Sequence, residues 1–389
     1  MQNLGVIFGS RTAEHDVSII SGLQVLENAD RKKYNAFPIY ISRAGEWFIG
    51  DALRDFKTYR DFDPNRKGLT RVFLPPVPGY NGLCAASSGM FSRSTKVAEL
   101  DCAILAMHGM HGEDGTIQGL FELADLPYSS AGVTGSAVGM DKIVMKAVFK
   151  SMGLPVLPGK DFYRREYQQS PEGVLDECEK IGYPLFVKPA NLGSSIGIGR
   201  AADRASLRAA IDVAVKYDRR VLVERGLEKP IEVNCACLGY GADSIPSLCE
   251  QPAGLDEFLS FEDKYTRGSG SKGMKSLARQ IPAPIGEEMT RAVQTMTKDI
   301  FRILECKGVV RVDYMIDRAT NELYVNEINT IPGSFAYYLY EPMGISFAEL
   351  IDRLVENAHL ALRDKHESSF AFSSEILEKA MRGAKMLKK

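Results

Sequence analysis

Two runs of residues near the C-terminus alternate between apolar and polar side chains and flank a short polar turn. They are VVRVDYMI at 309–316 and ELYVNEIN at 322–329, with DRATN at 317–321 between them. This pattern predicts an antiparallel hairpin, because side chains two residues apart in a strand lie on the same face. If the hairpin closes symmetrically around residue 319, residue 313 lies opposite residues 325–327. One face of the hairpin then carries Arg311, Asp313, Glu327 and Asn329.

The polar face of this hairpin suits a divalent cation. Carboxylate and amide oxygens are hard ligands, which favour Mg²⁺ or Mn²⁺ together with the phosphate oxygens that such ions hold. The alternative is a solvated polar face without a ligand, which is the usual role of a single acidic pair. Here the run NTIPG at 329–333 follows at once and fixes the backbone beside the cluster. We therefore interpret the two carboxylates and the amide as metal ligands, with Arg311 placed to neutralise a developing negative charge.

A glycine-rich loop upstream is similar to a phosphate-binding turn. GSSIG at 193–197 follows a predicted strand, PLFVK at 184–188, which ends in Lys188. Backbone N–H groups in such a loop can cradle phosphate oxygens, although a plain β-turn explains the loop equally well and no Walker A lysine follows. Together with the acidic hairpin, the loop and Lys188 predict a clamp for nucleotide phosphates. Lys142 is a candidate second cation, and its alternative role is on a solvated helix face.

Two glutamates flank a short connection between predicted strands. Glu224 ends the strand at 221–224, and Glu232 begins the strand at 232–238. Carboxylates at this place could accept hydrogen bonds from a purine amino group or from ribose hydroxyls, and the alternative is that both are strand-end surface residues. His108 and His111 have no further histidine or cysteine nearby, so we expect them to structure a loop rather than to bind metal.

Predicted strands and helices divide the chain into three α/β regions and a tail. The first region reads as a parallel sheet, whose ligands gather at the carboxyl ends of the strands. Its predicted strands are 4–8, 37–41 and 102–107, with a polar stretch between the second and third up to about residue 94. Further on, helical patterns cover 138–152 and 204–217. The expected boundaries are 1–135 for an N-terminal domain, 136–218 for a central subdomain, 219–364 for a C-terminal domain and 365–389 for the tail.

The tail is a candidate basic amphipathic helix from Ser373 to Lys389. Its apolar face holds Ile376, Leu377, Ala380 and Met381. Such a helix most often packs on its own protein or on a partner, and membrane binding is the less common alternative.

Composition excludes several classes of protein. The chain has 389 residues, with 48 Lys and Arg against 50 Asp and Glu, so its net charge of −2 attracts neither nucleic acid nor anionic lipid. No apolar run approaches the ~20 residues of a membrane span, and the strand-like N-terminus leaves no room for a signal peptide. The seven cysteines lack CxxC spacing, which favours reduced thiols and a cytoplasmic location.

Taken in order along residues 1–360, these motifs resemble the D-alanine–D-alanine ligase family of the ATP-grasp superfamily. The resemblance implies a three-domain ATP-grasp architecture, with the nucleotide between the central and C-terminal domains. The matching pieces are VIFGSRTAEHDVS at 6–18, HG at 108–109, GEDGTIQG at 112–119, MDK at 140–142, KP at 188–189, GSSIG at 193–197, DKY at 263–265, RVD at 311–313 and NEINTIPG at 326–333.

The resemblance also implies a reaction and a role for each motif. ATP phosphorylates the carboxylate of a first amino acid, and the amine of a second attacks the acyl phosphate. Two Mg²⁺ or Mn²⁺ ions, small amino-acid substrates such as D-alanine and a homodimer are expected. The expected catalytic residues are Glu14 (which holds the first ammonium), Ser195, Tyr265, Arg311 and Gly333. The expected ATP-binding residues are Lys142, Lys188, Ser194, Ser195, Glu224, Glu232 and Lys264. The expected metal ligands are Asp313, Glu327 and Asn329.

One departure concerns the second substrate. Five residues after Gly333 the family usually has a serine that helps bind the second carboxylate, and here Tyr338 takes that place. A phenol can donate a hydrogen bond but fills more space, so either acceptor binding is altered, or Tyr338 points into the core and a neighbour replaces it. The expected acceptor subsite consists of Ser334, Tyr337, Tyr338 and Leu339.

Three functions therefore remain open. The first is a D-alanine–D-alanine ligase, or a relative that joins D-alanine to another acceptor, inside or outside cell-wall synthesis. The second is a non-catalytic ATP-binding relative, and the third is another ATP-grasp carboxylate–amine ligase. In each enzymatic case, the Gly- and Ser-rich stretch at 264–275 is expected to close over the substrates.

Overall fold

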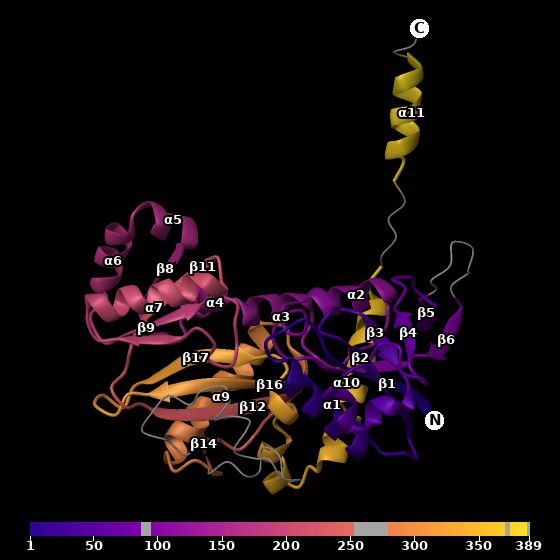
Figure 1. The fold of residues 1–389 in the computed structure, drawn as a ribbon, viewed down its shortest axis with the longest axis horizontal. Helices are drawn as coiled ribbons and strands as arrows, with labels where there is room; N and C mark the ends of the chain where they lie inside the picture. The colour runs from indigo at the N-terminus through magenta and orange to yellow at the C-terminus, as the bar shows by residue number, and fades with distance from the viewer. Residues whose placement is uncertain (87–94, 253–278, 370–373, 387–389) are drawn as a thin grey trace.

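The computed structural model describes residues 1–86, 95–252, 279–369 and 374–386. The expected Lys264, Tyr265 and loop 264–275 lie outside these residues. Figure 1 shows an N-terminal sheet on the right and two further sheets on the left, with helices α2, α3 and α4 running between them. Their bounds are α2 (Thr116–Ala124), α3 (Val133–Met140) and α4 (Lys142–Ser151).

The N-terminal sheet has seven strands in the order β6-β5-β4-β3-β2-β1-β7. Only β1 is parallel to both of its neighbours, β2 and β7, within the described residues, and the remaining pairs are antiparallel. The predicted parallel strands are thus confirmed, whereas the polar stretch before residue 94 contains three strands that the sequence did not predict, and a fourth, β6, follows it. The strands are β1 (Gln2–Gly9), β2 (Tyr34–Ile41), β3 (Trp47–Ile49), β4 (Thr70–Phe73), β5 (Gly82–Ala85), β6 (Lys96–Glu99) and β7 (Cys102–Ala106).

Helices α1 (His15–Asn28) and α10 (Phe347–Glu367) pack against this sheet and share its core. The strands β1 and β7 are almost entirely buried. Two short 3₁₀ turns, η1 (Asp51–Arg54) and η2 (Phe56–Tyr59), lie between β3 and β4. Burial of this apolar surface supplies the main free energy that fixes the loops at the carboxyl ends of β1 and β7.

The second sheet is antiparallel, with the order β10-β9-β11-β8. Because β11 pairs with β9 and β8, this unit extends past the expected boundary at residue 218. Its members are β8 (Gly159–Tyr163), β9 (Leu185–Pro189), β10 (Gly199–Ala201) and β11 (Arg220–Arg225), with helices α5 (Arg164–Gln169), α6 (Pro171–Glu179) and α7 (Arg204–Tyr217).

The third sheet is antiparallel, with the order β13-β12-β16-β17, and helix α9 (Glu287–Ile303) packs on it. Its strands are β12 (Ile231–Tyr240), β13 (Asp243–Pro246), β16 (Lys307–Ile316) and β17 (Leu323–Asn329). A small ladder joins β14 (Gln251–Pro252) to β15 (Arg279–Gln280), and the 3₁₀ segments η4 (Gly333–Leu339) and η5 (Glu341–Met343) follow the third sheet.

The predicted helix at 138–152 is divided at Asp141 into α3 and α4. The Asp141 carboxylate caps α4, since it accepts hydrogen bonds from the N–H groups of Ile143 and Val144 at 3.0 Å. Its other oxygen binds Arg220 at 2.6 Å. The capping hydrogen bonds and the ion pair with Arg220 together fix Asp141, and so fix the position of Lys142 at the start of α4.

The C-terminal helix α11 (Ile376–Met386) stands away from the body of the molecule (Figure 1). Ile376, Leu377 and Met381 are 71%, 77% and 66% exposed. The helix is therefore confirmed, but these side chains are not packed on the rest of the chain. None of the described helices combines the length and apolar character that crossing a membrane requires.

Candidate active site

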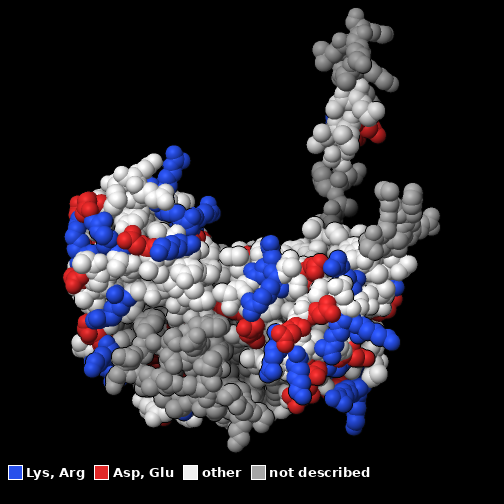
Figure 2. All heavy atoms as spheres, in the orientation of Figure 1, with Lys and Arg blue, Asp and Glu red and all other residues white. Residues whose placement is uncertain are grey.

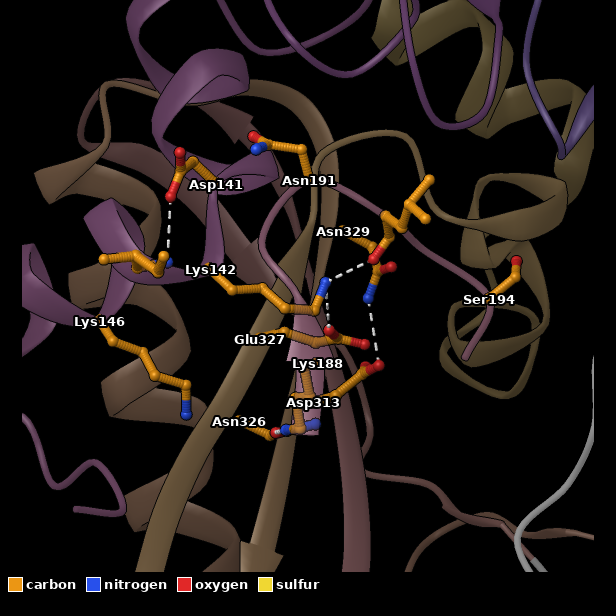
Figure 3. A network of polar contacts seen from close by, with 12 residues as sticks. Asp141, Lys142, Lys146, Lys188, Asn191, Ser194, Asp313, Asn326, Glu327 and Asn329 are labelled. Atoms are coloured by element: carbon orange, nitrogen blue, oxygen red, sulfur yellow. Dashed lines mark hydrogen bonds and ion pairs between the residues drawn. The ribbon is translucent and has the colours of Figure 1, made fainter. Parts of the chain in front are cut away.

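The hairpin of β16 and β17 has the register that the sequence predicted. Asp313 lies directly opposite Glu327, and Arg311 lies opposite Asn329. The Asp313 carboxylate accepts hydrogen bonds from Nε and Nη2 of Arg311 at 2.6 and 2.8 Å, and from Nδ2 of Asn329 at 3.1 Å. Hydrogen bonds therefore connect Arg311, Asp313 and Asn329, and Glu327 lies opposite Asp313 on the same hairpin, part of which Figure 3 shows.

The oxygen atoms on this face suit a divalent cation. Two carboxylates and one amide supply hard oxygen ligands. Among the described residues, no group of three or more His, Cys, Asp or Glu side chains is placed to hold a metal ion. Both carboxylates contact cationic side chains, Arg311 at Asp313 and Lys142 at Glu327. These contacts compensate the two negative charges.

Two lysines from separate elements reach the hairpin. Lys142, at the start of α4, donates to the carbonyl oxygen of Leu192 at 2.8 Å and lies 3.2 Å from Glu327. Lys188, in β9, donates to Oδ1 of Asn326 at 3.1 Å. Figure 3 shows Lys142, from helix α4, and Lys188, from strand β9, beside the residues of the hairpin. The structure thus brings the predicted phosphate-binding lysines and the predicted metal ligands together in the space between α4, β9 and the hairpin, here called the cleft.

Glu224 is buried beneath this cleft. Its carboxylate contacts the ammonium groups of Lys188, at 2.7 Å, and Lys146 of α4. Burial opposes the negative charge, but the two lysines outweigh it and lower the pKa of Glu224. Glu224 therefore anchors Lys188, and its expected contact with adenine stays a prediction. Glu232 is exposed at the start of β12. Burial acts to lower the pKa of Lys188, but Glu224 outweighs it and raises that pKa, with smaller contributions from Glu327 and Glu232.

Sequence reasoning did not identify Lys146. The available signal was the four-residue spacing between Lys142 and Lys146, which places both lysines on one face of the helix. Two such lysines repel each other, so the spacing predicts an acidic residue nearby. Glu224 is that acid for Lys146.

The glycine-rich loop lies against Glu14. Ser194 and Ser195 have left-handed backbone conformations, with φ of 52° and 59°, and the Ser194 hydroxyl donates to the Glu14 carboxylate. A Cβ added at Gly193 would come within 2.9 Å of Glu14 Oε2, so a larger residue here would displace the Glu14 carboxylate or the loop. Glu14 itself is only 8% exposed. The hydroxyl that reaches Glu14 here is that of Ser194, and the expected link from Ser195 stays a prediction.

A second carboxylate lies beside Glu14. Glu113 accepts hydrogen bonds from the N–H groups of Gly109 and Ile331, both at 2.8 Å. Burial and the nearby Glu14 raise the pKa of Glu113 to about 8. Glu113 belongs to the GEDG motif, but the sequence did not show that its partner lies 218 residues away.

His108, like Glu113, contacts the backbone of Ile331. Its Nδ1 lies 2.9 Å from the carbonyl oxygen of Ile331, and its Nε2 lies 2.8 Å from the Ser21 hydroxyl. Since a carbonyl only accepts, Nδ1 carries the proton and Nε2 accepts from Ser21. Burial lowers the pKa of His108 to about 4, which favours this neutral form. The predicted loop-structuring role of His108 agrees with these contacts, which hold the segment before Gly333 in place.

The four residues of the expected acceptor subsite point in different directions. Tyr337 stacks on Phe347 with ring centroids 4.5 Å apart, Leu339 is fully buried in the core, and the buried Ser334 donates its N–H to Ser21 at 3.4 Å. Tyr338 instead faces a charged cluster. Its hydroxyl lies 3.1 Å from Glu250, and the guanidinium of Arg279 lies 4.1 Å from its ring centroid.

Comparison with known proteins identifies the type of site. Residues 3–131 match the family profile described as "D-ala D-ala ligase N-terminus", and residues 148–356 match "D-ala D-ala ligase C-terminus". The chain is 39% identical to the D-alanine–D-alanine ligase of Thermosipho melanesiensis, covering 94% of this chain and 96% of that one. It is 38% identical to that of Solibacter usitatus, covering 95% and 98%.

Solved structures give the same result. The D-alanine–D-alanine ligase of Coxiella burnetii superposes with a TM-score of 0.75 at 26% identity, covering 94% of this chain and 98% of that one. The VanG D-Ala:D-Ser ligase of Enterococcus faecalis superposes with a TM-score of 0.75 at 30% identity, covering 92% and 99%. The two relatives differ in the acceptor that their names state, although their folds match this chain equally well.

Proposed function

Since the chain belongs to the D-alanine–D-alanine ligase family of ATP-dependent enzymes with the ATP-grasp fold, we propose that it joins D-alanine to a second D-alanine for peptidoglycan precursor synthesis. The observation that carries this proposal is the convergence of three groups on one cleft. These are the acidic hairpin, the two lysines and the Glu14 subsite beneath the glycine-rich loop.

We assign the metal site to Asp313, Glu327 and Asn329. Two Mg²⁺ or Mn²⁺ ions bound there would screen the charge of the phosphoryl group during its transfer. Lys142 and Lys188 lie beside these residues and bind phosphate oxygens in this proposal, while Glu224, Glu232, Ser194, Ser195 and Lys264 complete the nucleotide site. When ATP and metal bind, the Lys142 ammonium would leave Glu327 and contact a phosphate oxygen, while Glu327 would bind the metal.

The first D-alanine binds with its ammonium at Glu14. A buried carboxylate requires a cationic or hydrogen-bonded partner, and the ammonium of an amino acid supplies both. Its carboxylate then faces Arg311 and the N–H of Gly333, which stabilise the negative oxygen that develops as the acyl phosphate forms and reacts. Tyr265 and Ser195 support Glu14 in this arrangement. The second amine attacks the activated carbonyl, and phosphate leaves.

A second candidate function differs only in the acceptor. Tyr338 stands where the family usually has serine, and its hydroxyl lies at hydrogen-bond distance from Glu250. This observation favours a related ligase in which D-alanine is joined to a different second amino acid. We propose that the chain acts as a homodimer in either case.

A phosphate-release assay over D- and L-amino acids, with products identified by mass, tests both candidates. We expect phosphate release to require ATP, Mg²⁺ and D-alanine, and the product to be D-alanyl-D-alanine. A mixed product formed in preference when a second amino acid is added would favour the second candidate. ATP binding without phosphate release over the whole panel would contradict both.

A further inference from the structure

Both backbone polar groups of Ile331 are held by side chains of a single loop. The N–H of Ile331 donates to Oε1 of Glu113 at 2.8 Å, and its carbonyl oxygen accepts from Nδ1 of His108 at 2.9 Å. Both partners belong to the loop between β7 and α2, and Ile331 lies two residues before Gly333. Two hydrogen bonds therefore fix the segment that carries the Gly333 N–H to this loop.

The loop is itself closed through Glu113. The Glu113 N–H donates to the carbonyl oxygen of Gly109 at 2.9 Å, and its Oε2 accepts the N–H of Gly109 at 2.8 Å. Gly109 lies against the proposed first-substrate residue, since a Cβ added to it would come within 2.4 Å of Glu14 Oε2. The two oxygens of the Glu113 carboxylate thus hold two different segments, one beside Glu14 and one leading to Gly333.

A second set of contacts joins the same loop to the start of α1. The backbone N–H of His108 donates to the Ser18 hydroxyl at 2.9 Å, and that hydroxyl donates to the carbonyl oxygen of Glu14 at 3.2 Å. Ser18 and His108 are both buried. The loop therefore contacts the backbone of Glu14 on one side and the backbone of Ile331 on the other, and holds the two in fixed relative positions.

The segment after Gly333 does not keep its position by its own conformational preference. Ser334, Phe335 and Ala336 have left-handed backbone conformations, with φ of 49°, 54° and 50°. Three consecutive residues with a Cβ rarely adopt this conformation, because the Cβ crowds the backbone. Such a conformation persists only when the surrounding structure supports it, and the contacts at Ile331 supply support just before Gly333.

We propose that Glu113 is a positioning residue for the reaction, which places the N–H of Gly333 at the reacting carboxylate while Glu14 holds the ammonium of the same amino acid. This inference rests on the proposed function and adds to it a residue that acts through the backbone. The ammonium and the carboxylate of an amino acid are joined through one carbon atom, so the protein groups that bind them must keep a fixed separation. A misplacement of about 1 Å costs about 100-fold in rate.

The variants Glu113→Gln and Glu113→Ala test this proposal through kcat. The amide of Gln has one acceptor oxygen, so it keeps at most one of the two contacts, and Ala keeps neither. We expect kcat to fall about 10- to 100-fold in Glu113→Gln and further in Glu113→Ala, with the KM for ATP changed by less than about twofold. Each kcat is expressed per nucleotide-binding site, measured by calorimetric titration with Mg²⁺ and a nonhydrolysable ATP analogue, so that misfolded protein is not counted.

A double variant separates positioning from a general loss of structure. His108→Ala removes the side chain that holds the carbonyl oxygen of Ile331. If both side chains act by holding Ile331, their effects are not independent. The kcat of His108→Ala with Glu113→Gln should then lie within about threefold of the kcat of the less active single variant.

Glu122→Gln is the matched control for this series. Glu122 is a glutamate of the same domain that also accepts a hydrogen bond, from the Tyr128 hydroxyl at 2.8 Å, but it pairs with Lys365 of α10. This variant should leave kcat per nucleotide-binding site unchanged even if it lowers the free energy of unfolding.

The outcomes are distinct. If the wild type forms D-alanyl-D-alanine and Glu113→Gln keeps the wild-type kcat per site, the role of Glu113 is wrong while the proposed function stands. The role is also wrong if the double variant loses the full product of the two single losses, or if the KM for ATP rises as much as kcat falls. If Glu113→Ala binds no nucleotide, Glu113→Gln and the double variant decide. If the wild type releases no phosphate with D-alanine, the proposed function fails, and this inference with it.

Discussion

Lys142 and Glu327 lie 3.2 Å apart although they belong to different elements, Lys142 to the start of helix α4 and Glu327 to strand β17 of the third sheet. The pair forms across the cleft in which we place the nucleotide. Its two members are the residues to which phosphate and metal would bind, so ligand binding should replace this ion pair by two stronger interactions. The cleft therefore has internal charge compensation before its ligands arrive.

We expect Glu327→Gln to abolish nearly all ligase activity without unfolding the protein. The variant removes one ligand charge and should weaken binding of metal-bound nucleotide by about 1–3 kcal/mol. Calorimetric titration with Mg²⁺ and a nonhydrolysable ATP analogue measures this loss, and thermal unfolding checks the fold. Glu322→Gln, on the exposed turn of the same hairpin, is the matched control. Normal ATP turnover by Glu327→Gln would remove the metal site from the hairpin.

We expect Gly193→Ala to impair the first substrate site selectively. The added Cβ would come within 2.9 Å of Glu14 Oε2, so the loop or the carboxylate must shift where the substrate ammonium binds. The KM for the first D-alanine should rise at least tenfold, with a smaller change in the KM for ATP. Gly119→Ala is the control, because a Cβ there meets no atom within 4 Å. An unchanged first-site KM would place the ammonium elsewhere.

The stability of the ligand-free protein should fall as the pH decreases below about 6.5, in part because of His108. Its pKa is lowered from 6.5 to about 4 in the folded state. Between pH 6.5 and pH 4, His108 therefore binds a proton in the unfolded chain but not in the folded one. The contribution of His108 to the free energy of unfolding is complete above pH 6.5 and is lost as the pH falls toward 4. The loss is at most about 3 kcal/mol.

Urea unfolding at pH 7.5 and pH 5 measures this effect. His108→Asn should lose less stability between the two pH values than the wild type, whereas His366→Asn, which changes a half-exposed histidine, should behave like the wild type. Equal pH dependence in all three proteins would show that His108 takes up no proton on unfolding.

We expect Glu224→Gln to destabilise the fold by about 3–5 kcal/mol, because it leaves Lys146 and Lys188 near each other without their shared buried anion. Removing one of the lysines as well, in Glu224→Gln with Lys146→Met, should recover part of this loss. Chemical denaturation of the two single variants and the double variant gives the coupling energy. If Glu224→Gln alters only the KM for ATP, its role is in the adenine site and not in anchoring the lysines.

The sequence predicted the elements whose side chains alternate strongly. The hairpin register, with Asp313 opposite Glu327, follows from a period of two on both strands. Strands β3 to β6 were missed, because each is only three or four residues long, so no period of alternating side chains could develop. The division at Asp141 was missed because the helical pattern continues through it, although aspartate is a common N-cap.

Residues that act through distant contacts were the harder part of the site. Glu113 meets Ile331 across 218 residues, and Tyr338 meets Glu250 across 88. Neither spacing has a local signature, so only the assembled sheets reveal it. The lysines and metal ligands could be proposed earlier, because each belongs to a short run whose composition already indicates its chemistry.

The described residues on the face shown in Figure 2 form no large patch of a single charge. Lys and Arg are interspersed with Asp and Glu on the face shown in Figure 2. The exposed apolar side chains of α11, by contrast, could promote association between copies of the chain at high concentration. A small exposed hydrophobic patch on this helix, which stands away from the body of the molecule, consists of Ile376, Leu377 and Met381. A chain truncated after residue 369 should therefore stay monodisperse in light scattering at concentrations where the full chain forms larger particles, and should crystallise more readily.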